Sequence, residues 1–142
     1  MVRVLLVEDS LADVELTRAA LEEVSIDAEL PVVRDGEEAL AYLHREGEHA
    51  DAVRPHLVLL DLNLPKMGGI EVLERLQADR DPVLRRLPVI VLTTSQSAAD
   101  VARCYELRAN CLVTKPMTAD DLVGAVRSLA SFWLGVATLP PQ

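Results

Sequence analysis

Short, uninterrupted apolar runs recur along this chain, and each is followed by a segment with helical spacing. Four runs are clear, at residues 2–7, 57–60, 89–92 and 111–113, and a weaker one covers residues 30–33. Runs of this length without polar alternation are typical of strands that are covered on both faces, as in a parallel sheet. The sequence therefore predicts five strands, all in the interior of the domain.

Helix-capping patterns mark the segments between the runs. An oxygen acceptor is followed three residues later by an acid in four places: Ser10 with Asp13, Asp35 with Glu38, Ser97 with Asp100, and Thr118 with Asp121. Apolar residues recur at helical spacing in five segments: Val14, Leu21 and Val24; Ala39, Leu40 and Leu43; Ile70, Leu73 and Leu76; Val101 and Tyr105; Leu122, Val126 and Leu129. The polar stretches 45–55 and 79–86 are predicted to be loops.

Strands that alternate with helices favour a parallel sheet with right-handed crossovers and helices on both of its faces. The predicted fold is therefore a doubly wound α/β fold. The chain has 142 residues, half of them apolar, which suits one domain with a substantial core.

Composition argues against nucleic-acid and membrane partners. The net charge is −9 and the fourteen basic residues are not gathered in the sequence, so a nucleic-acid backbone would be repelled. We find no leader-like terminus and no apolar run near the roughly 20 residues of a membrane span, so we expect a cytoplasmic protein. Cys104 and Cys111 lack the spacing of redox or zinc motifs and are predicted to be free thiols.

Polar side chains follow the predicted strands, at the edge where parallel sheets bind their ligands. These residues are Glu8 and Asp9, Asp61, Thr93, and Lys115. A single acid in such a place is ordinarily a helix cap or a solvated loop residue. Three carboxylates at one edge repel each other and call for a cation. Mg²⁺ fits better than zinc, because the site offers neither thiolate nor imidazole.

A cation at this edge would also attract a phosphoryl group. The metal, the Lys115 ammonium and the Thr93 hydroxyl can share the phosphoryl oxygens while one carboxylate attacks phosphorus. Asp61 is the best candidate for that nucleophile, because it ends the third and predicted central strand. The backbone near Asn63 can add a metal ligand if the following turn is tightly specified. Pro65, Gly68 and Gly69 suit such a turn, and they equally suit a plain connection from strand to helix.

The segments VEDS, LLDLNLPKMGG, VLTTS and TKPMT, in this order, resemble the receiver domain of two-component response regulators. The resemblance covers about residues 2–130 and implies a flavodoxin-like (βα)5 fold with strand order 2-1-3-4-5. We expect a receiver domain at 1–130 and a C-terminal extension at 131–142. The resemblance implies these roles: Asp61 as phospho-acceptor; Glu8, Asp9, Asp61 and the Asn63 carbonyl around Mg²⁺; Thr93 and Lys115 on the phosphoryl group.

One position departs from the receiver pattern. Leu112 stands three residues before Lys115, where receivers often have an aromatic residue. In many receivers that aromatic moves together with the threonine and so reports phosphorylation. Thr93 lacks this aromatic partner here, so a different group must respond to a shift of Thr93.

Three further stretches are similar to the single-domain regulators of bacterial and cyanobacterial phytochrome kinases: YLHREGEHADAVRPHLVLLDLNLPK, NCLVTKP and FWLGVATLP. This similarity implies a sensor histidine kinase, a bacteriophytochrome, as partner. It also implies a homodimer, formed through the last two helices, the fifth strand and the tail.

The only Phe and the only Trp of the chain are adjacent, at Phe132 and Trp133, beyond the last helical turn that we predict. Aromatic anchors dominate contacts between partners, and a self-complementary patch makes a twofold dimer. We therefore expect these two residues to anchor a homodimer. The alternative is an extension that packs back onto its own last helix.

Three functions compete. The first is a signalling module that accepts a phosphoryl group on Asp61, for a phytochrome or for another kinase as relay intermediate or phosphate sink. The second is an aspartate-nucleophile phosphohydrolase, but Asn63 stands where such sites carry their second acid. The third is a flavodoxin-type carrier, whose phosphate the acids of EDSLAD would repel. We expect the first function, and no enzyme acting on free substrates.

Overall fold

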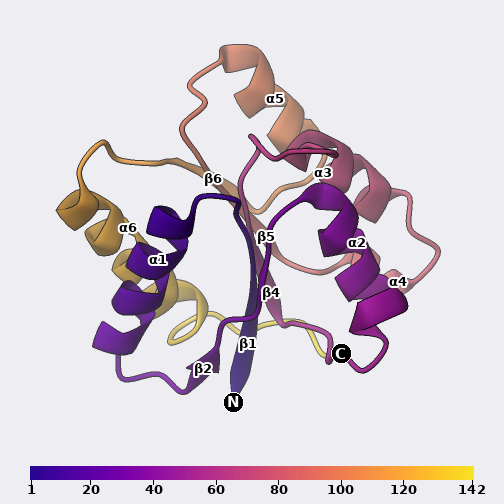
Figure 1. Cartoon of the computed structure of the whole chain (residues 1–142), viewed down its shortest axis with the longest axis horizontal. Coiled ribbons are helices and arrows are strands. Elements are labelled where there is room, and N and C mark those ends of the chain that lie inside the picture. Colours follow the sequence, from indigo (N-terminus) through magenta and orange to yellow (C-terminus); the bar gives the residue numbers. More distant parts are fainter.

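A parallel β-sheet runs through the centre of the computed structural model, which describes residues 1–142 (Figure 1). Its neighbouring strands follow the order β2-β1-β4-β5-β6, with β3 also paired to β1. All pairs are parallel. The strands are β1 (Val2–Val7), β2 (Ala28–Glu29), β3 (Val32–Val33), β4 (Leu57–Leu60), β5 (Val89–Thr93) and β6 (Cys111–Thr114).

The weaker apolar run forms two short strands instead of one. β2 pairs with the start of β1 and β3 pairs with its end. Pro31 lies between them and has no N–H to give to a ladder, although its carbonyl still accepts from the Leu6 N–H at 2.9 Å. With β2 and β3 taken as one interrupted strand, the predicted order 2-1-3-4-5 is confirmed.

All four predicted capping patterns begin helices. The side chains of Ser10, Asp35, Ser97 and Thr118 each accept a hydrogen bond from the backbone N–H three residues on. The helices are α1 (Leu11–Glu23), α2 (Gly36–His44), α3 (Gly69–Gln77), α4 (Pro82–Arg85), α5 (Ala98–Glu106) and α6 (Ala119–Trp133).

The structure corrects three boundaries. The predicted loop 45–55 contains a 3₁₀ turn, Gly47–His49, and the predicted loop 79–86 contains α4. The Asp81 side chain caps α4 through the Val83 N–H, and Pro82 starts it, which is a short-range signal that the polar composition concealed. Helix α6 continues to Trp133, so the aromatic pair lies in its last turn and not beyond it.

Helices cover both faces of the sheet, as predicted. α1 and α6 pack together on one side, and α2, α3 and α5 lie on the other (Figure 1). The predicted buried face of α2 is confirmed. The prediction for α5 is wrong at Tyr105, which is half exposed, because Cys104 is the residue that enters the core. None of the helices has the length and apolar character that crossing a membrane requires.

Candidate functional site at the carboxyl edge of the sheet

The predicted site residues converge at the carboxyl edge of the sheet. Glu8 follows β1, Asp61 follows β4, Thr93 ends β5, and Lys115 follows β6, and all four side chains are buried. Backbone hydrogen bonds extend the strand ladders to these positions: Glu8 N to Val33 O, Asp61 N to Val7 O, and Lys115 N to Thr93 O at 2.7 to 3.1 Å. The sheet itself therefore fixes where each side chain starts.

Lys115 joins the carboxylates of this edge. Its Nζ donates to Glu8 Oε2 at 2.6 Å, to Asp13 Oδ2 at 2.8 Å and to Asp61 Oδ2 at 3.1 Å. Burial by itself lowers the pKa of the Lys115 ammonium. The hydrogen bonds to Asp13 and Glu8 and the charges of Asp61 and Glu8 outweigh that effect and hold the pKa above its ordinary value. Lys115 is therefore a fixed positive charge at neutral pH.

Glu8 is the most deeply buried acid of the site. Burial raises the pKa of its carboxyl, and the nearby charge of Asp61 adds to the rise, against the hydrogen bonds from Lys115 and the Ser10 N–H. The Ser10 N–H donates to Glu8 Oε1 at 3.1 Å, so both carboxylate oxygens have partners. One ammonium thus compensates only part of the negative charge held here.

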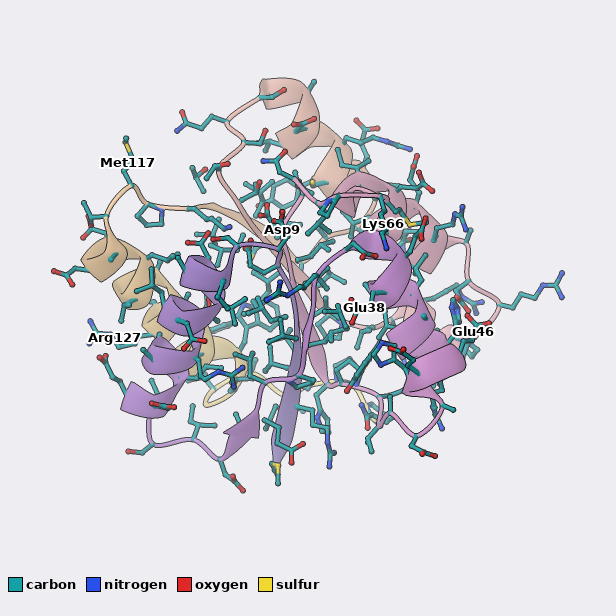
Figure 2. The ribbon with its side chains drawn as sticks, in the orientation of Figure 1. Asp9, Glu38, Glu46, Lys66, Met117 and Arg127 are labelled. Carbon is teal, nitrogen blue, oxygen red and sulfur yellow. The ribbon has the colours of Figure 1, made fainter.

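Three acids offer a cluster of oxygen donors. Carboxylate oxygens of Glu8, Asp9 and Asp61 lie within 4.8 Å of one another. Asp9 is exposed at the edge of the sheet, where Figure 2 labels it, and the other two are buried. An oxygen-only set with excess negative charge suits a hard divalent cation, and the donor chemistry therefore fits Mg²⁺ or Mn²⁺.

The turn after Asp61 is held against the strand end. The Asn63 N–H donates to Asp61 Oδ1 at 3.2 Å, and the Asn63 amide nitrogen donates to Thr94 Oγ1 at 3.4 Å. A Cβ at Gly69 would lie 2.4 Å from the Asp61 carbonyl oxygen, and one at Gly36 would lie 2.3 Å from the Met67 carbonyl oxygen. Only glycine allows these approaches. The turn is thus built to a specific shape, as the sequence reasoning required.

Thr93 and Leu112 occupy neighbouring strands. The Thr93 hydroxyl oxygen is fully buried and accepts from the Ser95 N–H at 3.3 Å, while Ser95 Oγ donates to Asp100 on α5 at 2.8 Å. Leu112 packs on the core, and its N–H donates to the Tyr105 hydroxyl at 3.1 Å. The polar contacts of the Thr93 hydroxyl therefore run toward α5 and not toward Leu112.

The family model described as "Response regulator receiver domain" matches residues 4–127. The chain belongs to the response regulator receiver family. The predicted family is thereby confirmed.

Curated and solved relatives agree with this assignment. Response regulator Rcp1 of Synechocystis sp. (PCC 6803) is 48% identical over 137 residues, which are 96% of this chain and 92% of Rcp1. The crystal structure of the Mn²⁺-bound form of Rcp1 aligns with a TM-score of 0.94 at 47% identity, over 99% of this chain and 100% of that one. The phosphorylated cyanobacterial phytochrome response regulator RcpA aligns with a TM-score of 0.93 at 47% identity, over 98% of both chains. This receiver is thus similar to phytochrome response regulators.

The sequence reasoning missed one residue of this receiver's site. It assigned Asp13 to a helix cap, yet only the Asp13 backbone N–H serves the cap, and the side chain reaches Lys115. A signal was available, because Asp13 lies in the first turn of the helix that begins just after Glu8 and Asp9, and so near the same edge of the sheet. Its partner, 102 residues away in sequence, could not be read from that spacing.

The aromatic pair of the receiver points in two directions. Trp133 is partly buried and packs on the core beneath α1 and α6, whereas Phe132 is 52% exposed. The rings meet edge to face, with centroids 5.5 Å apart. The alternative, an extension that packs back onto the last helix, does not describe Trp133, because Trp133 is the last residue of that helix and packs on the core. Of the two rings, that of Phe132 is the more available to a partner.

Proposed function

We propose that this response regulator accepts a phosphoryl group on Asp61 from a sensor histidine kinase. The observation that carries the proposal is the setting of the Asp61 carboxylate: it is buried at a strand end, with one oxygen facing the Asn63 N–H and the other facing Lys115 Nζ. Both oxygens are thus oriented by hydrogen-bond donors of the chain. The crystal structure of phosphorylated RcpA supports the same chemistry in a similar chain.

The transfer is a displacement at phosphorus. An Asp61 carboxylate oxygen forms a bond to phosphorus, and the bond from phosphorus to the kinase's histidine nitrogen breaks. The nitrogen keeps the electron pair and leaves as neutral imidazole when its second nitrogen carries a proton. The product is an aspartyl-phosphate. Lys115 and Thr93 would stabilise the transferred oxygens. The Lys115 ammonium lies 3.1 Å from Asp61 Oδ2, and Thr93 ends β5, the strand next to β4.

Glu8, Asp9, Asp61 and the Asn63 carbonyl would hold the metal. The fit rests on the three clustered carboxylates, whose charge one lysine does not balance. We propose Mg²⁺ as the ion, and the Mn²⁺-bound form of Rcp1 supports a divalent cation in a similar site. A bound Mg²⁺ supplies charge neutralisation for the phosphoryl oxygens. Before transfer, the Asn63 N–H and the Lys115 ammonium hold the two oxygens of the nucleophile in place.

A signalling role fits this site better than hydrolysis of free substrates. Asn63 stands where a second acid would be needed, and its amide nitrogen is engaged with Thr94. Asn63 cannot protonate a leaving group, so the site has an acceptor without a general acid. We therefore propose that the chain carries out its own phosphoryl transfer and does not turn over free phosphoesters.

The proposed kinase is a bacteriophytochrome, and the similarity to a cyanobacterial phytochrome response regulator supports it. We further propose that the receiver spans residues 1–130 and that the extension 131–142 contributes to a homodimer, with Phe132 as anchor. The half-exposed Phe132 ring supports this role. The proposed place of action is the cytoplasm, where kinase domains use ATP, and the net charge of −9 argues against DNA as a partner.

The decisive experiment is labelling by a phosphorylated phytochrome kinase, or by acetyl phosphate, in the presence of Mg²⁺. We expect Asp61→Asn to remove labelling, because the amide cannot form the aspartyl-phosphate. Asp51→Asn is the matched control, since Asp51 is exposed on a distant loop, and it should label like wild type. Undiminished labelling of Asp61→Asn would refute the proposed acceptor. Labelling that is independent of Mg²⁺ would refute the proposed metal.

A further inference from the structure

Lys115 has one acceptor that does not belong to the proposed metal set. Asp13 Oδ2 lies 2.8 Å from Lys115 Nζ, closer than Asp61 Oδ2. Asp13 belongs to the first turn of α1, whereas Glu8 and Asp61 follow strands. Its side chain is 27% exposed, and that of Lys115 is 5% exposed, so Asp13 covers the solvent side of the ammonium.

The three acceptors use all the donor capacity of the lysine. An ammonium group has three N–H donors, and Glu8, Asp13 and Asp61 provide one acceptor each. Two of these acceptors change their role in the reaction proposed above. Glu8 and Asp61 would turn an oxygen to the metal, and Asp61 loses its negative charge when it becomes an acyl phosphate. Asp13 is the acceptor that this chemistry leaves unchanged.

The position of Asp13 is fixed independently of its side chain. Its N–H donates to Ser10 Oγ at 3.3 Å, and its carbonyl accepts from the buried Thr17 hydroxyl at 2.8 Å. Both contacts use the backbone, so the carboxylate is free to hold Lys115. A substitution of the side chain therefore leaves the helix start in place.

We propose that Asp13 is a positioning residue that holds the Lys115 ammonium in the site while Glu8 and Asp61 engage the metal and the phosphoryl group. This inference rests on the proposed function. Through Asp13, helix α1 would then position the Lys115 ammonium, which we propose to contact the transferred phosphoryl oxygens.

The chain allows a direct test, because Lys66 and Lys115 are its only lysines. Side-chain ammonium ¹⁵N NMR therefore gives at most two signals, and Lys66, which is 64% exposed, exchanges its protons rapidly with water. The slowly exchanging signal reports on Lys115. We would record it in the free protein and after loading with Mg²⁺ and beryllofluoride, which mimics a phosphoryl group on a carboxylate.

In wild type we expect the Lys115 signal to persist on loading. In Asp13→Asn we expect the Lys115 ammonium protons of the loaded protein to exchange with water about tenfold faster. A factor of about ten is what the loss of one hydrogen bond between charged groups implies for an equilibrium. Glu15→Gln is the matched control, because it removes the same charge from an exposed position of the same helix, and its exchange should equal wild type. Wild-type exchange in loaded Asp13→Asn would overturn the proposal.

A second measurement separates an effect through Lys115 from a general effect of charge. Asp13→Asn should slow acetyl phosphate labelling in the wild-type background and have no effect on top of Lys115→Met. An equal slowing in both backgrounds would overturn the proposal. If Asp13→Asn does not fold, Asp13→Glu gives the same test with a smaller expected change. Failure of wild type to load or label would instead count against the proposed function.

Discussion

Burial of the Glu8 carboxyl has an electrostatic cost. The carboxyl is buried, its pKa is raised chiefly by that burial, and its main compensation is Lys115 at 2.6 Å. A buried charge that is only partly compensated opposes folding and favours whatever ligand neutralises it. The residue that destabilises the metal-free protein is therefore the one that favours a cation.

The raised pKa of Glu8 predicts a pH dependence with a definite sign. The folded protein binds the Glu8 proton more tightly than the unfolded chain does. The stabilisation of the folded state by this proton is therefore fully present below the ordinary pKa of 4.5, and it is lost as pH rises through the higher pKa of the folded state. In urea unfolding without metal, wild type should lose stability relative to Glu8→Gln as pH rises above about 4.5.

The size of that pH effect depends on the metal. Saturating Mg²⁺ at pH 7 should stabilise wild type and leave Glu8→Gln nearly unchanged, because binding to the folded state alone shifts the unfolding equilibrium. A stability difference between the two proteins that stays constant from pH 4 to pH 7 would contradict the assignment of the raised pKa to Glu8.

At the scale of elements, the turn between β4 and α3 connects the site to the rest of the fold. Gly69 starts α3, and its N–H donates to the Leu62 carbonyl at 3.0 Å; Gly36 starts α2, and its N–H donates to the Met67 carbonyl at 3.1 Å. Lys66, which Figure 2 shows near α2, lies 3.7 Å from Asp35, the cap of that helix. Two helix starts thus hold the turn that follows Asp61.

Gly69→Ala tests this arrangement. The added Cβ would lie 2.4 Å from the Asp61 carbonyl oxygen and 2.8 Å from the Leu62 Cα, both backbone atoms, so α3 or the strand end must move. We expect the free energy of unfolding to fall by about 1–3 kcal/mol, the usual cost of overpacking, and labelling of Asp61 to slow.

Gly68→Ala is the matched control for that substitution. Gly68 has a φ of −74°, and its Cβ would lie 3.5 Å from the nearest atom, the Leu62 carbonyl oxygen. The change at the N-cap should cost no more than about 1 kcal/mol. Equal losses of stability in the two variants would show that the close approach of Gly69 to the Asp61 carbonyl adds no cost beyond that of replacing a glycine at this helix start.

Local sequence signals predicted the elements of the fold and the edge at which the site forms. The caps at Ser10 and Thr118 and the buried run of β4 depend on neighbouring residues alone, and so they could be read from the chain. The contact of Asp13 with Lys115 depends on how α1 sits against β6, which no local pattern encodes. The same limit explains Tyr105, whose exposure is set by the packing of α5.

At the scale of the whole molecule, the site and the chain terminus lie at opposite ends of the sheet. Asp9 stands at one end, and the C-terminus lies near the other (Figures 1 and 2). The Gln142 side chain donates to the carbonyls of Arg54 and Pro55, just before β4. The residues after α6 therefore return to their own domain, and one face of α6, with Phe132, stays exposed.

That face has an apolar centre and a charged border. Phe132 and Val136 are 52% and 74% exposed, and they line a shallow groove with Val24 and Arg127. Arg127 is paired with Glu23 of α1 at 2.9 Å. A twofold contact here would bury both apolar groups against their own copies, which is the arrangement that a self-complementary patch allows.

The proposed homodimer predicts different outcomes for the two adjacent aromatics. Phe132→Ala should raise the dimer dissociation constant about thirtyfold, as loss of an exposed anchor worth about 2 kcal/mol implies, without lowering thermal stability of the monomer. Trp133→Ala should instead lower the unfolding temperature, because Trp133 packs on the core. Mass measurement by sedimentation over a dilution series checks both, with Val53→Ala, equally exposed on a distant loop, as control. A wild type that stays monomeric, or a Phe132→Ala dimer as stable as wild type, would rule out this anchor, since the exposed ring would then contribute to neither the fold nor the interface.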